Sequence, residues 1–156
     1  MQMVRTTSPE QTRALGERLG AAAFPGTVIA LVGDLGVGKT LLAQGVGHGL
    51  GVPGLVTSPT FVLMRVHDGG RLPLVHADIY RLCDEDEAEH AGLPEALASG
   101  AVALVEWADL LPGLLPDDHL RVELRWLTGC PDQRELRLIA TGPTHAPLEA
   151  LIHAPS

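Results

Sequence analysis

Positive charge is scarce in this sequence. Its 156 residues include 11 lysines and arginines against 19 aspartates and glutamates, which gives a formal net charge of −8. This balance argues against binding a nucleic acid through bulk electrostatics, although it does not exclude a basic protein partner. Lysine is especially rare, because Lys39 is the only one in the chain.

Cysteine pairs and long apolar runs are also missing. The two cysteines, Cys83 and Cys130, do not form a pair at metal-ligand spacing, which is typical of structural thiols in a reducing compartment. The N-terminus has no apolar leader, and no apolar run approaches the length of a membrane-spanning helix. Because 46% of the residues are hydrophobic, we expect one cytoplasmic domain over residues 1–156 with its own core.

The single lysine lies in a glycine-rich segment. This segment reads Gly33-Asp34-Leu35-Gly36-Val37-Gly38-Lys39-Thr40 and fits the pattern G-x-x-x-x-G-K-[ST]. An apolar run at 28–32 precedes it, and apolar residues at helical spacing, beginning with Leu41, follow it. Glycines let such a loop turn its backbone N–H groups toward an anion, and the helix N-terminus adds further donors. We therefore predict a nucleotide-phosphate site in which Lys39 reaches the β- and γ-phosphates and the Thr40 hydroxyl binds Mg²⁺.

The rest of the pattern predicts an α/β fold. Ser8 followed by Pro9 is typical of a helix start, with Ser8 as the N-cap and Gln11 completing a capping box. A turn signal at 67–70 predicts an antiparallel hairpin after the P-loop helix, joined to an otherwise mostly parallel sheet. We expect helices at 9–23, 39–50, 84–91, 95–98 and 147–152, and strands at 28–32, 61–66, 72–77, 101–105, 120–126 and 135–140.

Two acidic residues are candidates for Mg²⁺ and water chemistry. Glu106 directly follows an apolar strand, and in open α/β sheets ligands gather at strand ends of this kind, so it is the first candidate on the metal side. Asp78 leaves the second hairpin strand beside His76 and Tyr80, and could orient water or hold Mg²⁺ in the outer shell. The alternatives are a solvated charge at Glu106 and a turn cap at Asp78.

A threonine and several histidines complete the polar candidates. Thr60 follows the P-loop helix within Ser58-Pro59-Thr60, a placement that resembles a switch segment whose hydroxyl meets Mg²⁺ or the γ-phosphate. An ST-turn at the start of a strand explains Thr60 nearly as well. The histidines at 48, 67, 90, 119, 145 and 153 show no ligand spacing, and we assign them no role.

Missing motifs narrow the class of nucleotide protein. With one lysine, already used in the loop, the chain cannot contain the Asn-Lys-x-Asp guanine reader of GTPases. It also has no Leu-Ser-Gly-Gly-Gln stretch of transporter ATPases, and its later arginines lie on expected strands rather than in a kinase-like lid. These absences favour ATP over GTP.

Four motifs together resemble one family. GDLGVGKT, SPTF, HADIYRL and LVEW, in this order, resemble the TsaE family of bacterial P-loop ATPases, which are needed for making threonylcarbamoyladenosine in tRNA. The resemblance extends from about Ser8 to Ala140 and implies a compact, three-layer P-loop NTPase fold with helices flanking a mostly parallel sheet. It also implies binding to a TsaD–TsaB pair, which transfers the threonylcarbamoyl group to tRNA and which ATP hydrolysis would reset between turnovers.

The resemblance also implies roles for residues matched by motif. These are phosphate binding by Lys39 and the Gly33–Gly38 backbone, Mg²⁺ binding by Thr40 and Glu106, a switch-like Thr60, and an acid near the γ-phosphate at Asp78. Arg134 fits the position of an arginine that contacts nucleotide in the family, just before the last expected strand. Two departures, Val37 for the usual alanine and Leu41 for the usual Thr or Ser, remove no ligand.

The leading hypothesis is therefore a Mg²⁺-dependent ATPase, weak alone and stimulated by TsaD–TsaB. A nucleotide-sensing module without essential hydrolysis is the main alternative, because no arginine finger or clear catalytic base can be assigned. A small-molecule kinase is the third. The acidic balance fits a subunit that meets tRNA only through its partners.

Overall fold

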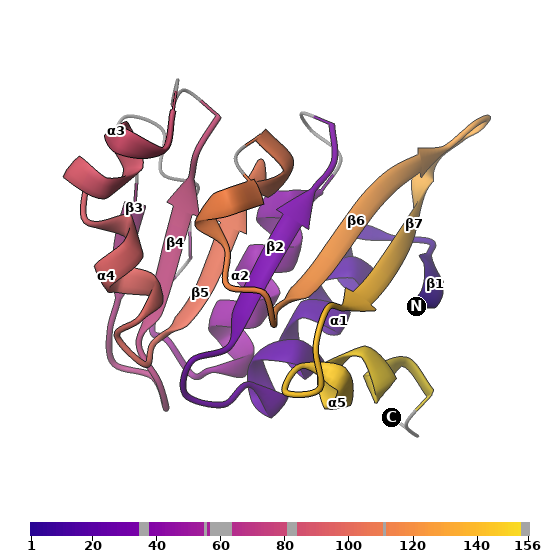
Figure 1. The fold of residues 1–156 in the computed structure, drawn as a ribbon. Helices are drawn as coiled ribbons and strands as arrows, with labels where there is room; N and C mark the ends of the chain where they lie inside the picture. Colours follow the sequence, from indigo (N-terminus) through magenta and orange to yellow (C-terminus); the bar gives the residue numbers. More distant parts are fainter. Residues whose placement is uncertain (35–37, 55, 57–63, 81–83, 111, 154–156) are drawn as a thin grey trace.

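The computed structural model describes residues 1–34, 38–54, 56, 64–80, 84–110 and 112–153, whose strands form one seven-stranded sheet in the order β1-β7-β6-β2-β5-β4-β3 (Figure 1). The strands are Gln2–Thr6 (β1), Val28–Val32 (β2), Met64–His67 (β3), Leu74–Asp78 (β4), Val102–Glu106 (β5), Leu120–Leu127 (β6) and Cys130–Ala140 (β7). The helices are Pro9–Ala22 (α1), Lys39–Gly49 (α2), Glu85–His90 (α3), Leu93–Leu97 (α4) and Ala146–Glu149 (α5), with 3-10 turns at Ala108–Leu110 (η1), Pro112–Leu114 (η2) and Ala150–His153 (η3).

The sheet is parallel in the middle and antiparallel at its edges. Strands β6, β2, β5 and β4 run in the same direction. Strand β3 pairs antiparallel with β4, which confirms the predicted hairpin, although residues 61–63 of its first expected strand lie outside the described residues. Strand β7 pairs antiparallel with both β6 and β1. Antiparallel pairing is thus more extensive than the sequence pattern predicted, and β1 was not predicted at all.

Helices cover both faces of the sheet, which makes three layers. Apolar side chains of α1 and α2 pack on one face over β2, β5, β6 and β7, and Figure 1 shows both helices behind the strands. On the other face Ala88 of α3, Leu93 of α4 and Ala108 of η1 pack against β2, β4 and β5. Among the described residues, no helix is both long and apolar enough to cross a membrane.

The start of α1 follows the predicted signal with one difference. Ser8 is the N-cap and its Oγ accepts the Gln11 N–H at 3.2 Å, as expected. The Gln11 side chain does not return to Ser8, as a capping box requires, but accepts the Thr7 N–H at 2.7 Å. The side chains of Ser8 and Gln11 therefore each accept a backbone N–H at the start of α1.

Helices α1 and α2 approach each other through glycines. A Cβ added to Gly16 would lie 2.3 Å from the Leu42 carbonyl oxygen, and one added to Gly20 would lie 2.2 Å from that of Val46. On α2, a Cβ on Gly45 would lie 2.1 Å from the Arg13 carbonyl oxygen. These neighbours are backbone atoms, which cannot rotate away. The missing side chains therefore fix how closely α2, which begins at Lys39, sits against the rest of the fold.

Gly20→Ala tests this close contact. Alanine is favoured over glycine in a helix interior by roughly 1 kcal/mol, so propensity alone predicts stabilisation. We expect the unfolding free energy to fall instead, by about 1–3 kcal/mol, because the helices must separate. Denaturant unfolding measures the change, and Ala14→Gly at an exposed position of α1 gives the propensity contribution alone. A more stable Gly20→Ala protein would contradict the close contact.

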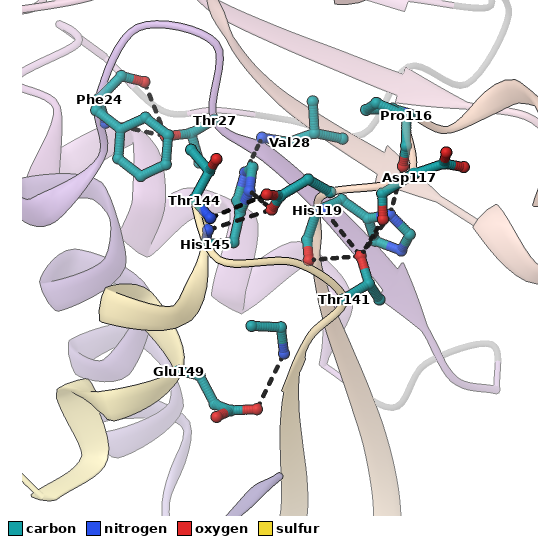
Figure 2. Close-up of polar contacts among 12 residues, drawn as sticks. Phe24, Thr27, Val28, Pro116, Asp117, His119, Thr141, Thr144, His145 and Glu149 are labelled. Carbon is teal, nitrogen blue, oxygen red and sulfur yellow. Dashed lines mark hydrogen bonds and ion pairs between the residues drawn. The ribbon is translucent and has the colours of Figure 1, made fainter.

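A cluster of hydrogen bonds, which we call the polar junction, connects several chain segments at the end of the sheet where β2 begins (Figure 2). Asp118 accepts the backbone N–H groups of Thr144 and His145, and its Oδ1 lies 2.8 Å from His145 Nδ1. The Val28 N–H donates to His145 Nε2 at 3.0 Å, so Nε2 carries the lone pair and Nδ1 the hydrogen. The Phe24 ring packs on the same imidazole at 5.2 Å. His145, which had no predicted role, therefore ties three chain segments together.

The junction changes the acidity of Asp118. Burial by itself raises the pKa of this carboxyl, but the hydrogen bonds from Thr144 and His145 outweigh it and lower the pKa to about 2. Because this pKa lies below the ordinary value of 3.8, the charged carboxylate stabilises the fold at neutral pH. That contribution is lost as the pH falls through the interval between the two values.

Asp118→Asn tests this linkage. We expect the variant to have a lower unfolding free energy than the parent at pH 7. The difference should shrink as the pH falls from about 4 to about 2, because the parent then protonates its own carboxylate. Denaturant unfolding at a series of pH values measures both effects, and Asp117→Asn at the exposed neighbouring position is the control. A difference that does not vary with pH would argue against the assignment.

Candidate functional site

Four of the predicted site residues meet at the C-terminal ends of the central parallel strands. Gly33 directly follows β2, Glu106 ends β5 and Asp78 ends β4, and these strands are parallel neighbours. Asp78 and Glu106 are partners in the β4–β5 register. Lys39 is the first residue of α2. In Figure 1 the arrowheads of β2, β5 and β4 all point to the upper edge, opposite the polar junction.

Lys39 is buried, which is unusual for this residue type. Only 5% of it is exposed. Its Nζ donates to the Gly33 carbonyl oxygen at 2.7 Å and lies 3.5 Å from the centre of the Trp107 ring. The Tyr80 ring packs against the same tryptophan at 4.7 Å. The ammonium group is thus held by a carbonyl and an aromatic face, a contact that attracts cations.

Acids around Lys39 offset part of the cost of burying its charge. Burial lowers the pKa of the Lys39 amine below its ordinary value, because it disfavours the charged form. The carboxylates of Glu106, Asp78, Asp109 and Asp34 offset this only in part. An anion placed beside the amine would stabilise its charged form further. Lys39 is therefore a candidate contact for a negatively charged ligand.

Trp107 adopts a backbone conformation that bulky residues rarely take. Its φ is 60°, the positive value that among the described residues is otherwise found at glycines. Its N–H donates to the Leu31 carbonyl oxygen at 3.1 Å, which anchors the residue to β2. Strain of this kind costs roughly 1–3 kcal/mol and clusters at functional sites. Sequence reasoning gave Trp107 no role, although its position directly after Glu106 was the available signal.

Glu106 is buried and bonded, not solvated. It is 4% exposed, and its Oε2 lies 2.5 Å from Nε2 of the fully buried His76. This burial argues against the alternative of a solvated charge at the strand end. Charge of opposite sign, on Lys39, lies within electrostatic reach.

Asp78 caps a turn and lies near the other charged residues of the site. Its Oδ1 accepts the Tyr80 N–H at 2.9 Å, so it does cap the turn after β4. It also lies close enough to Glu106 and Lys39 for their charges to act on it. Burial raises the pKa of the Asp78 carboxyl, and the neighbouring Glu106 carboxylate raises it further. The backbone hydrogen bond from Tyr80 opposes both.

The glycine-rich segment at 33–40 is described at its two ends. Gly38 is the N-cap of α2 with φ 116°, a conformation that favours glycine, and no side chain of the described residues caps the helix there. Thr40 is exposed in the first turn and Leu41 is half-buried. Lys39 and Thr40 thus lie in the first turn of α2, where a helix leaves backbone N–H groups without intrahelical partners. The predicted ligands Leu35, Gly36 and Val37, and the switch candidate Thr60, lie outside the described residues.

Arg134 lies near this segment, but within a strand. Strand β7 begins at Cys130, earlier than expected, so the arginine is inside it and not before it. Its guanidinium lies 5.3 Å from the Trp126 ring. With Gly38 and Leu41 it lines a small cavity of about 40 Å³. The structure therefore brings Arg134 to the start of α2, and its contact with a nucleotide stays a prediction.

A second cavity borders the other end of the segment. It measures about 260 Å³ and is lined by residues of β2, β6 and β7 and by Gly33 and Asp34. Its wall carries both signs of charge, from Arg125 and Arg137 and from Asp34, Glu123 and Glu135. The sequence analysis did not foresee this cavity, because it forms only when the β6–β7 hairpin is placed beside β2.

The donors at the site suit Mg²⁺ held together with a nucleotide. Among the described residues, no group of three or more His, Cys, Asp or Glu side chains could hold a metal ion by itself. Mg²⁺ at nucleotide sites takes only one or two protein ligands, because phosphates and water complete its octahedron. The Thr40 hydroxyl and the carboxylates of Glu106 and Asp78 are oxygen donors of the right kind.

Comparisons with known proteins agree on a family. A family model described as "Threonylcarbamoyl adenosine biosynthesis protein TsaE" matches residues 6–135. The tRNA threonylcarbamoyladenosine biosynthesis protein TsaE of Bacillus subtilis is 42% identical over 138 residues, which cover 88% of this chain and 85% of that one. The protein of the same name from Streptomyces coelicolor is 43% identical over 133 residues, covering 83% and 89%.

The fold agrees as well. The crystal structure of Bacillus subtilis YdiB matches with a TM-score of 0.81 at 34% sequence identity, covering 97% of this chain and 93% of that one. The matched residues of the family model contain Gly38, Lys39, Asp78, Glu106 and Arg134, and so span the site described above. The chain belongs to the TsaE family.

Proposed function

We propose that residues 1–156 form one P-loop NTPase domain that hydrolyses ATP with Mg²⁺ and serves the threonylcarbamoyladenosine modification of tRNA in the cytoplasm. The tRNA role is supported by the names of relatives that cover most of the chain. The hydrolytic role is supported chiefly by one observation. The only lysine is buried at the start of α2, within reach of two carboxylates at the ends of neighbouring parallel strands.

Lys39 would bind and orient the phosphates. Its ammonium now contacts the Gly33 carbonyl oxygen and the Trp107 ring, both weaker partners than a phosphate anion. A nucleotide would therefore compete well for the amine. The N–H groups at the start of α2 would bind the same phosphates, and the Arg134 side chain would contact the nucleotide beside Gly38 and Leu41.

The two strand-end acids would divide the remaining work. Glu106 would hold Mg²⁺ together with Thr40, while Asp78 would orient the attacking water. When bound, the ion would neutralise charge on the phosphates during transfer. Glu106 is buried and Asp78 is half-buried, which limits the access of bulk water and strengthens their interactions with charged groups. Thr60 would complete the set as a switch residue.

The chain would act with a TsaD–TsaB-like pair. A formal net charge of −8 argues against direct binding of tRNA by this subunit. Threonylcarbamoyl transfer would therefore take place on the partner, and ATP hydrolysis here would reset the assembly between turnovers.

A nucleotide-sensing module without essential hydrolysis is the second candidate. One observation favours it: Oδ1 of Asp78, the candidate for orienting water, already accepts the Tyr80 N–H. In this case ATP and ADP would favour different partner states, and turnover would not be needed.

Lys39→Ala tests the phosphate site. We expect phosphate release from ATP, measured with Mg²⁺ and the TsaD–TsaB pair, to fall by about 100-fold, because transition-state charge loses its main cation. Arg13→Ala removes an exposed positive charge from α1 and should leave the rate unchanged. Equal rates for Lys39→Ala and the parent would refute the ATPase proposal.

Glu106→Gln separates the two candidate functions. The amide keeps the shape of the side chain but removes its charge, so we expect the protein to bind ATP and to release phosphate about 100-fold more slowly. Multiple-turnover modification of tRNA in the reconstituted system should slow in parallel. If the variant binds ATP and still supports many rounds of modification, the sensing module is the better description.

A further inference from the structure

His76 occupies a position in β4 that an apolar residue would suit better. It is completely buried, as are Leu74 and Ala77 on either side of it in the strand. A buried polar side chain is tolerated when its hydrogen-bonding atoms are paired. Only one of the two His76 nitrogens meets that condition in the described part of the chain, because Nδ1 has no hydrogen-bond partner.

The paired nitrogen contacts the candidate metal ligand. His76 Nε2 lies 2.5 Å from Glu106 Oε2, and the two side chains are 0% and 5% exposed. A carboxylate can only accept a hydrogen bond, so Nε2 is the donor. The hydrogen bond to Glu106 is therefore the one that the described residues give this ring. An unpaired buried atom is a cost to stability, so stability alone does not explain this histidine.

The carboxylate has a reason to need an anchor. Asp78 and Glu106 are register partners on adjacent parallel strands, and like charges so close repel each other. A Glu side chain has several rotamers into which repulsion could turn it. The bond from His76, which lies two residues before Asp78 on the same strand, opposes that rotation.

We propose that His76 is a positioning residue that fixes the Glu106 carboxylate for Mg²⁺–nucleotide. The inference rests on the proposed function, because it assigns a partner to the residue expected to hold the ion. Residues that orient metal ligands by hydrogen bonds contribute about 10- to 100-fold to metal affinity or activity. His67, on the neighbouring strand, provides a comparison, because its buried Nε2 also has no hydrogen-bond partner among the described residues.

Two amide variants separate positioning from simple packing. The Gln amide reaches about as far as Nε2 and can still donate to Glu106, whereas the shorter Asn amide reaches about as far as Nδ1 and cannot. Binding of a non-hydrolysable ATP analogue is measured by calorimetry for His76→Gln, His76→Asn and the control His67→Asn, each with Mg²⁺ and with a chelator. Thermal unfolding without nucleotide is recorded for every variant.

With Mg²⁺, we expect His76→Asn to bind the analogue about 10-fold more weakly than the parent does. With chelator, its affinity for the analogue should lie within about twofold of the parent's. His76→Gln should recover most of the Mg²⁺-dependent gain, and His67→Asn should keep all of it. Equal weakening of His76→Asn with and without Mg²⁺, or failure of His76→Gln to differ from it, would overturn the positioning role.

The parent protein supplies the remaining distinction. If it binds the analogue no better with Mg²⁺ than with chelator, the proposed function fails and this inference fails with it. If the parent shows the gain and His76→Asn keeps it in full, only the positioning role is wrong. If His76→Asn unfolds below the assay temperature, the comparison of His76→Gln with the parent decides. A His76→Gln protein that binds the analogue no more tightly with Mg²⁺ than with chelator would contradict the proposal.

Discussion

Parallel pairing of β2, β5 and β4 is the constraint on which the site depends. It aligns the strand ends, so that Gly33, Glu106 and Asp78, which are distant in sequence, meet beside the start of α2. The glycine contacts between α1 and α2 then set how close Lys39 comes to these strand ends. At the other end of β2, His145 bonds the first strand N–H and holds the chain segments that enter and leave the sheet. The site is therefore positioned by backbone contacts more than by its own side chains.

Charge burial gives the site its chemical character. Lys39, Glu106 and His76 are nearly inaccessible: Lys39 contacts the Gly33 carbonyl oxygen and the Trp107 ring, and His76 contacts Glu106. Burial lowers the pKa of the Lys39 amine and raises that of the Asp78 carboxyl, so both groups are less stable in their charged forms than they would be in water. The strained backbone of Trp107 adds to this stored cost. A ligand that brings both phosphates and a cation would relieve several of these costs together.

The sequence predicted what depends on local pattern. The P-loop spacing identified Lys39, and the apolar run at 101–105 placed Glu106 at a strand end. It did not predict β1, a short edge strand with alternating exposure, or the early start of β7, where Pro131 and Asp132 read as a turn. Long-range partners were equally out of reach: the Lys39–Trp107 and His76–Glu106 contacts need the sheet to be assembled first. Thr60 stays a prediction, since it lies outside the described residues.

Lys39 is both the only lysine and a buried one, which has a consequence for the surface of the protein. All other basic side chains apart from histidine are arginines, so the surface presents guanidinium groups and almost no side-chain amine. Enzymes and reagents that acylate lysine thus have a single side-chain target, shielded by Gly33 and the Trp107 ring. Its lowered pKa would make that amine a good nucleophile once reached. Acylation would remove the positive charge of this amine, so a chain acylated at Lys39 would lose the group proposed to bind the phosphates.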